Sequence, residues 1–217
     1  MVSLNLGQIL EVHAKNYPKK LAVKDWHGKT LTYPELESRT DRLANALLKM
    51  GLQKGDRCAV MLYNCTEFIE VICAFAKIGV VGVPVSWRFV EKEVEYVVDN
   101  CDAKAMIVYE EFVDCVNHVR PNLTKIEDKN YVIVGKTTPK GYVSYGKIIA
   151  NSQDKEPDVK VDGKDAWLQI YTSGTTGIPK GVVRSHESYI AFYLINAVEF
   201  CFSEKDYGMV IMPLYHV

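Results

Sequence analysis

The sequence predicts an α/β fold in which helices flank a mostly parallel sheet. Helical and strand patterns alternate along most of the 217 residues, as they do in chains built from strand–helix–strand units. The run Val80–Val85 is also continuously apolar, which is typical of a strand buried on both faces of a parallel sheet. A chain of this length can form one large domain or two small ones, each with its own core.

The first third of the chain begins with a helix, predicted over Leu4–Tyr17 from the spacing of its apolar residues. Two short strands, Leu21–Trp26 and Lys29–Thr32, then surround a turn at His27 and Gly28. Thr32 and Glu35 have the spacing of a capping box, so a second helix is expected to begin at Thr32. Gly51 is expected to end that helix.

The next elements are predicted around the apolar centre of the chain. Arg57–Leu62 has the composition of a strand, and Val80–Val85 is the next strand. Between them, Asn64 and Glu67 have the spacing of a helix cap, and Gly79 is placed to end the helix.

The alternation continues in the second half of the chain. Four further elements are expected at Val90–Asn100, Lys104–Tyr109, Glu111–Val119 and Tyr131–Val134. Asn151–Lys164 is polar and predicts a connecting loop, which leads into a strand over Ala166–Tyr171. Gly181–Arg184 is expected to be extended, Ser185 to cap a helix that ends near Cys201, and Tyr207–Met212 to form a last strand before Pro213.

Composition excludes several classes of protein. A net charge of −1 without a basic patch argues against a nucleic-acid partner. No charged leader precedes the first apolar residues, and Val71–Val85 is interrupted and too short for a membrane span. The six cysteines form no CxxC pair or metal-ligand spacing, which indicates free thiols in a reducing compartment and a cytoplasmic location.

The most informative segment is Thr172–Gly181, which reads TSGTTGIPKG. Glycines allow backbone N–H groups to converge on an anion, the hydroxyls add short donors, and Lys180 adds a mobile positive charge. This composition is suited to binding polyphosphate. It is not a Walker A loop, because Ile178 and Pro179 separate Gly177 from the lysine. A simple surface turn is the alternative that composition leaves open.

The order of these ten residues resembles the phosphate-binding signature of the adenylate-forming (AMP-binding) superfamily. Further matches are LTYPEL at Leu31–Leu36, GLQKGDRCAVMLYNCTEF at Gly51–Phe68, KIGVVGVPVSWRF at Lys77–Phe89 and PLYH at Pro213–His216. Together they look most like acyl-CoA synthetases of the fatty-acid–CoA ligase type. The resemblance implies stacked, mostly parallel sheets flanked by helices. It also implies that residues 1–217 are the N-terminal part of the large AMP-binding domain, without the C-terminal lid domain.

The resemblance implies a two-step ligase reaction. A carboxylic acid and ATP, with Mg²⁺, form an acyl-adenylate, and the thiol of coenzyme A then displaces AMP. The ATP contacts carried over from the family fall on Thr172, Ser173, Gly174, Thr175, Thr176, Gly177 and Lys180. Thr172 is the candidate magnesium ligand, Lys180 and His216 are the candidate catalytic residues, and Tyr215 and His216 are expected to contact the acid.

Several alternatives stay open. His216 could be a buried core histidine, and Trp87 and Arg88 could serve in packing or helix capping, so these two are left outside the predicted site. The thiol acceptor could be a carrier protein instead of coenzyme A. The chain could also be an inert truncated fragment or an interaction module. The sequence does not identify the acid. It also leaves open whether the protein forms a homodimer.

Overall fold

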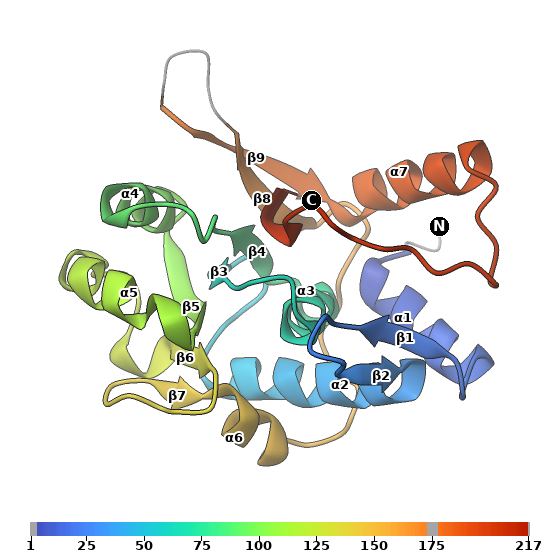
Figure 1. Ribbon diagram of the computed structural model, residues 1–217, viewed down its shortest axis with the longest axis horizontal. Helices are drawn as coiled ribbons and strands as arrows, with labels where there is room; N and C mark the ends of the chain where they lie inside the picture. Colours follow the sequence, from blue (N-terminus) through green and yellow to red (C-terminus); the bar gives the residue numbers. More distant parts are fainter. Residues whose placement is uncertain (1–3, 173–177, 217) are drawn as a thin grey trace.

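The computed structural model describes residues 4–172 and 178–216. Its larger sheet has seven strands (Figure 1). In spatial order these are β7 (Val143–Ser144), β6 (Tyr131–Val134), β5 (Ala103–Tyr109), β3 (Arg57–Met61), β4 (Val81–Pro84), β8 (Ala166–Thr172) and β9 (Lys180–Ser185). Every neighbouring pair is parallel except β8 and β9. A separate antiparallel pair consists of β1 (Leu21–Lys24) and β2 (Thr30–Thr32). The predicted mostly parallel sheet is therefore confirmed.

Helices cover both faces of this sheet. They are α1 (Leu6–Asn16), α2 (Tyr33–Lys49), α3 (Thr66–Ile78), α4 (Glu91–Asn100), α5 (Val113–Val119), α6 (Tyr145–Ala150) and α7 (His186–Glu199). One core packs α2, α3 and α6 against the sheet, and a second packs α4 and α5 against the opposite face, at the left of Figure 1. The side chains of β3 alternate between the two cores, with Cys58 and Val60 in one and Ala59 and Met61 in the other.

Several predicted helix boundaries are confirmed. The Glu35 carboxylate accepts hydrogen bonds from the Thr32 N–H (2.7 Å) and hydroxyl (2.8 Å) at the start of α2. Ser185 caps α7, because its hydroxyl accepts the Ser188 N–H. Gly79 ends α3 with φ of 68°, in the left-handed region that favours glycine. A Cβ at Gly79 would also lie 2.8 Å from the Lys54 side chain.

Two predictions of local structure are wrong. Asn64 does not cap α3, because Cys65 occupies the N-cap position and the Asn64 side chain binds a segment far along the chain. Tyr207–Met212 does not form a strand. Within the described residues no strand lies beside this segment, so its backbone has no ladder to join. Its side chains are exposed, Met209 at 86% and Ile211 at 80%.

The connector between α6 and β8 is held against the helices by buried charge. The Lys77 ammonium, on α3, lies 2.6 Å from a Glu37 carboxylate oxygen and 2.7 Å from one of Asp41, both on α2. The third partner, Glu156, belongs to the connector and lies 2.7 Å away. The Lys77 side chain is fully buried, so this cluster fixes the path by which the chain enters β8.

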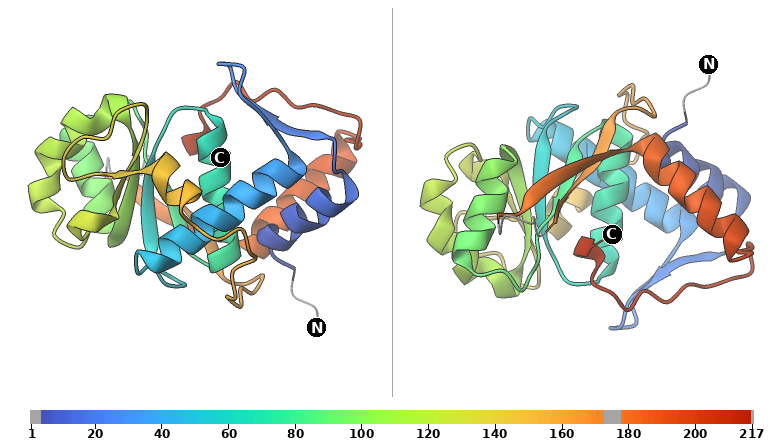
Figure 2. Two further views of the ribbon diagram at one scale, coloured as in Figure 1. Left: turned by 90° about the horizontal axis from the view of Figure 1, so that it is seen from below. Right: turned by 90° about the horizontal axis from the view of Figure 1, so that it is seen from above.

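The last helix, α7, lies beside α1 at one end of the molecule (Figure 2). Its first residue, His186, is buried, and its Nδ1 accepts the Leu6 N–H at 3.3 Å. The ring also stacks on Trp167. Burial lowers the pKa of His186 to about 4 and outweighs the opposing effect of the Asp165 carboxylate. No described helix combines the length and the apolar character needed to cross a bilayer.

Because the pKa of His186 is lowered in the folded protein, we expect the protein to lose stability in acid. The unfolded histidine binds a proton near pH 6.5, whereas the folded one does so only near pH 4, so stability falls as the pH drops through that window. The contribution is on the order of 3 kcal/mol. We expect the difference in unfolding free energy between the wild type and His186→Asn to shrink by this amount between pH 7 and pH 4. His118→Asn, at an exposed histidine, is the control; an unchanged difference for His186→Asn would contradict the prediction.

Candidate functional site

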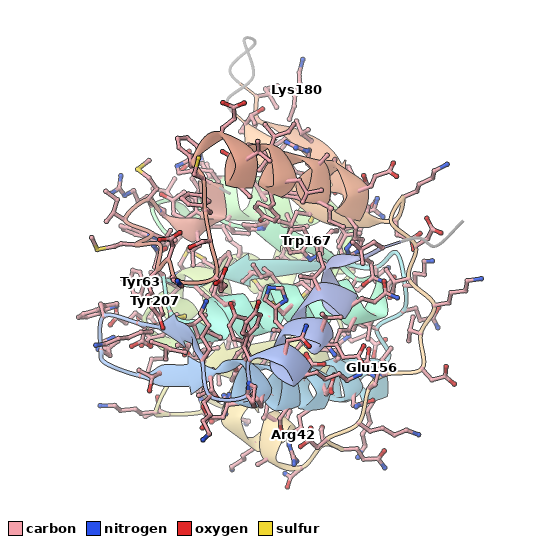
Figure 3. The ribbon with its side chains drawn as sticks, turned by 90° about the vertical axis from the view of Figure 1, so that its right-hand side faces the viewer. Arg42, Tyr63, Glu156, Trp167, Lys180 and Tyr207 are labelled. Carbon is pink, nitrogen blue, oxygen red and sulfur yellow. The ribbon has the colours of Figure 1, made fainter. Side chains whose placement is uncertain are left out.

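The candidate phosphate-binding residues lie at the end of the β8–β9 pair at which the chain passes from β8 to β9. Thr172 ends β8 and Lys180 begins β9, and the two are opposite each other in the antiparallel register. Both are exposed, and the Lys180 side chain extends away from the body of the molecule (Figure 3). Ser173, Gly174, Thr175, Thr176 and Gly177 lie outside the described residues.

The β8–β9 pair is anchored at both of its ends. At the inner end, the Trp167 indole N–H donates to the Ile72 carbonyl of α3 at 2.9 Å. At the outer end, the Tyr96 hydroxyl of α4 donates to the Pro179 carbonyl at 2.9 Å, next to Lys180. No local sequence pattern predicts this contact, because 83 positions separate its two partners. The backbone at Lys180 is therefore held against α4.

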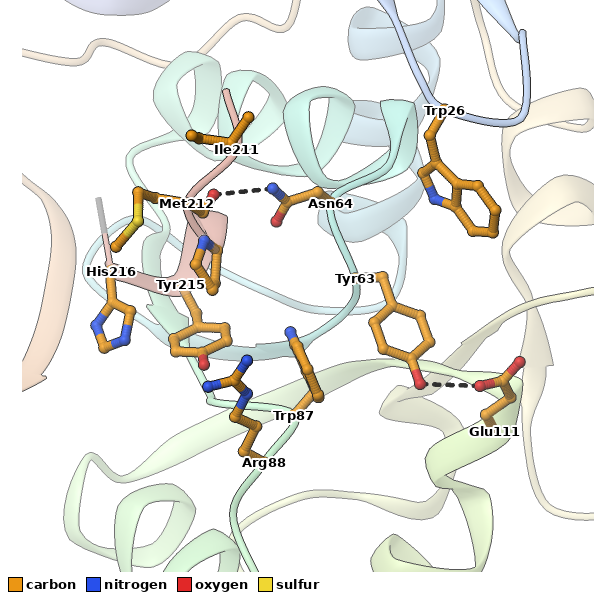
Figure 4. Close-up of a pocket in the computed structure, with 11 residues that line it drawn as sticks. Trp26, Tyr63, Asn64, Trp87, Arg88, Glu111, Ile211, Met212, Tyr215 and His216 are labelled. Atoms are coloured by element: carbon orange, nitrogen blue, oxygen red, sulfur yellow. Dashed lines mark hydrogen bonds between the residues drawn. The ribbon is translucent and has the colours of Figure 1, made fainter. Parts of the chain in front are cut away.

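A cavity of about 750 Å³ is the second part of the site (Figure 4). Its lining includes four aromatic residues and one histidine, and it comes from five separate stretches of the chain. The lining residues are Trp26, Tyr63, Asn64, Trp87, Arg88, Glu111, Ile211, Met212, Pro213, Tyr215 and His216. The structure therefore brings the two candidate acid-binding residues, Tyr215 and His216, together in one cavity. Thr172 and Lys180 are not among its lining residues.

Aromatic edges and faces hold the cavity walls in place. Tyr215 is buried, and its ring meets the ring of Trp87 edge-on at 6.3 Å between centroids. Tyr63 contacts Trp87 from another direction at 5.4 Å. The Tyr63 hydroxyl donates to Glu111 at 2.9 Å. Burial is the larger cause that raises the pKa of Tyr63, and the Glu111 carboxylate is the second. These contacts keep the cavity walls rigid and largely apolar.

Trp87 and Arg88 do not belong to the site that the sequence predicts, but the structure places both in the cavity wall. The Arg88 guanidinium lies over the Trp87 ring, 4.8 Å from its centroid. The useful signal in the sequence was their position just beyond the apolar strand that ends at Val85. Ligands of open α/β sheets bind outside the carboxyl ends of the strands, where such residues gather.

The same rule relates the cavity to the β8–β9 pair. Tyr63 and Asn64 follow β3, Trp87 and Arg88 follow β4, and Glu111 follows β5. Thr172 is itself the carboxyl end of β8. Because β3, β4, β5 and β8 are parallel, all of these residues lie along one edge of the sheet. The cavity and the candidate phosphate-binding residues therefore share the edge at which such folds bind their ligands.

The described residues at this edge offer little for a metal ion. Thr172 supplies one neutral hydroxyl oxygen, whereas Mg²⁺ is usually held by one or two carboxylates together with substrate phosphates. Within residues 4–172 and 178–216, the one carboxylate group with metal-ligand spacing is Glu37, Asp41 and Glu156. The Lys77 ammonium already fills its centre. Thr172 can therefore fit Mg²⁺ only where bound phosphates supply most of the other ligands.

Known proteins share both the sequence and the fold of this chain. It is 32% identical over 220 residues to the medium-chain fatty-acid–CoA ligase of Escherichia coli, covering 98% of the chain and 38% of the enzyme. It is 33% identical over 186 residues to the fatty acid–[acyl-carrier-protein] ligase ScoC of Streptomyces coeruleorubidus, covering 86% of the chain and 34% of that protein. The chain therefore spans little more than a third of the length of each relative.

A solved structure gives the same picture. The crystal structure of ATP-bound MatB from Rhodopseudomonas palustris superimposes with a TM-score of 0.85 at 25% identity, over 99% of this chain and 41% of that one. The profile of the family described as AMP-binding enzyme matches residues 10–217. Because this match covers nearly the whole chain, the chain belongs to the AMP-binding enzyme family.

Proposed function

We propose that this chain is the N-terminal part of the AMP-binding domain of an ATP-dependent acid–thiol ligase. The enzyme would activate a carboxylic acid, a fatty or related acid, as its acyl-adenylate and transfer the acyl group to coenzyme A. The observation that carries the proposal is the shared sheet edge, where Thr172 and Lys180 lie at the end of the pair at which the chain passes from β8 to β9, and Tyr215 and His216 line a cavity with several aromatic walls. Family membership and the names of the relatives support it.

The first half-reaction assigns a role to each end of the site. A carboxylate oxygen of the acid forms a bond to the α-phosphorus of ATP, and the bond from that phosphorus to the bridging oxygen of pyrophosphate breaks. Negative charge then grows on the departing β- and γ-phosphates, and Lys180 with the hydroxyls of Thr172, Ser173, Thr175 and Thr176 would neutralise it. Mg²⁺ would neutralise the same phosphates, with Thr172 as a protein ligand. Tyr215 and His216 would hold the acid.

In the second half-reaction a thiol sulfur attacks the acyl carbon and AMP leaves. Coenzyme A is the acceptor we propose, as in the name of the Escherichia coli relative. A carrier-protein thiol is the second candidate, because the name of the Streptomyces relative specifies an acyl-carrier protein. We expect the enzyme to act in the cytoplasm.

Pyrophosphate release tests the proposal. The longer protein that contains this chain is assayed with Mg·ATP and a panel of carboxylic acids, followed by coenzyme A or a carrier protein. Acid-dependent release of pyrophosphate and formation of an acyl thioester are the expected results. No release with any acid would reject the ligase function. For the chain alone, calorimetry measures the affinity for Mg·ATP, and a Kd weaker than ~1 mM would favour an inert fragment.

A further inference from the structure

Asn64 connects the sheet to the segment that carries Tyr215 and His216. It lies three positions after the end of β3. Its side-chain Nδ2 donates to the Met212 carbonyl at 2.9 Å, and its Oδ1 accepts the Leu214 N–H at 2.8 Å. Figure 4 shows the first of these bonds across the cavity wall. Two backbone groups on either side of Pro213 are thus paired with one side chain.

The carboxamide of Asn64 makes both bonds at once. Asparagine presents a donor and an acceptor on one planar group, whereas aspartate only accepts and leucine does neither. Pro213 has no N–H of its own, so the groups of Met212 and Leu214 are the nearest ones available to a partner. The Asn64 amide therefore replaces the neighbouring strand that this segment lacks among the described residues.

Little else fixes this segment to the sheet. Within the described part of the chain, the two Asn64 bonds are the hydrogen bonds that join residues 207–216 to residues outside that range. Residues 207–211 are exposed, and the His216 N–H is bonded locally to the Pro213 carbonyl. Packing is supplied by Leu214 against one core and by Tyr215 against Trp87. The orientation of Tyr215 and His216 thus depends on how Asn64 holds the backbone at Met212 and Leu214.

We propose that Asn64 is a positioning residue for the acid-binding cavity. Its amide sets the place of Tyr215 and His216 in the cavity wall and thereby the affinity for the acid, without contacting ATP. This inference rests on the proposed function for its effect on catalysis. The hydrogen-bonded clamp itself can be measured without any activity.

The first experiment uses hydrogen exchange on the 217-residue chain. In Asn64→Leu, which is similar in size but lacks both polar groups, the Leu214 amide is expected to exchange at least ~10-fold faster than in the wild type. Asn64→Asp keeps the acceptor, so the Leu214 amide should stay protected. Asn122→Leu removes a side-chain hydrogen bond to Glu95 on α4 and is the matched control. Unchanged exchange at Leu214 in Asn64→Leu would overturn the clamp.

The second experiment uses pyrophosphate release by the longer protein. Asn64→Leu is expected to lower kcat/KM for the acid roughly 10- to 100-fold, the loss that follows a misplaced binding group, while KM for ATP stays within about twofold. Asn64→Asp should recover part of this loss. Equal losses for acid and ATP, or no loss, would overturn the positioning role. An inactive wild type would instead reject the proposed function, and the exchange result would still decide whether the clamp exists.

Discussion

Replacing Lys180 with alanine is expected to slow pyrophosphate release by ~10²-fold, about the loss of one strong contact to a charged transition state. Lys180 begins β9 opposite Thr172, and the Tyr96 hydroxyl holds the carbonyl of the preceding residue. If ATP binds as we propose, the ammonium would reach its phosphates from a backbone position that this hydrogen bond holds in place. The measurement is single-turnover pyrophosphate release by the longer protein at saturating acid.

The control for Lys180 is a second exposed lysine, Lys140, which lies in a turn. Lys140→Ala removes the same charge far along the chain from β9 and should leave the rate unchanged. Lys180→Arg keeps the charge but changes its shape, so an intermediate rate is expected. Release by Lys180→Ala at the wild-type rate would remove the lysine from the mechanism.

Replacing Lys77 with methionine is expected to lower the free energy of unfolding by about 3–5 kcal/mol at pH 8, the usual cost of leaving buried charge unpaired. The ammonium lies within 2.7 Å of an oxygen of each of Glu37, Asp41 and Glu156, and its own side chain is fully buried. Urea unfolding followed by circular dichroism measures the change. Lys129→Met breaks an exposed ion pair with Glu127 and should cost less than about 1 kcal/mol.

The cost of Lys77→Met should depend on pH. Burial raises the pKa of Glu37 from 4.5 to about 7, although the ammonium partly offsets this. The folded protein therefore binds this proton more tightly than the unfolded chain, and the stability that Glu37 contributes is lost as the pH rises from 4.5 to 7. Without the ammonium the pKa of Glu37 should rise further. In acid Glu37 is then protonated, so the variant no longer carries an unpaired charge at this position. We expect the cost to be smaller at pH 5 than at pH 8.

A compensating variant separates charge from packing. Lys77→Met combined with Glu37→Gln and Asp41→Asn removes the unpaired carboxylates, and we expect it to recover most of the lost stability at pH 8. If the triple variant stayed as unstable as Lys77→Met, the loss would come from the shape of the lysine side chain and not from its charge.

The sequence predicted those parts of the fold that depend on neighbouring residues. The box formed by Thr32 and Glu35, the end of α3 at Gly79 and the cap at Ser185 each use groups within a few positions of one another. The alternation of strands and helices also predicted the parallel sheet, because periodicity reports burial on each face.

The errors arose where the partner is distant. Asn64 has the preferred residue type for a helix cap, but it binds Met212 and Leu214 instead, 148 and 150 positions away. The apolar character of Tyr207–Met212 suits a strand, yet a strand also requires a hydrogen-bonding neighbour. The contact of Tyr96 and the cavity could not be predicted for the same reason, since no local pattern reveals a distant hydroxyl or a wall contributed by five stretches of the chain.

The pairing of β4 with β8 joins two segments that are far apart in the sequence. β3, β4, β5 and β6 lie close together in the sequence and can pair early, whereas Gly82 meets Leu168 across more than 80 residues. Closing so long a loop has an entropy cost, and the contacts that offset this cost form only when the connector is already in place. We therefore expect the β8–β9 pair to dock last, so that the proposed phosphate-binding end of the molecule forms on a framework that has already folded.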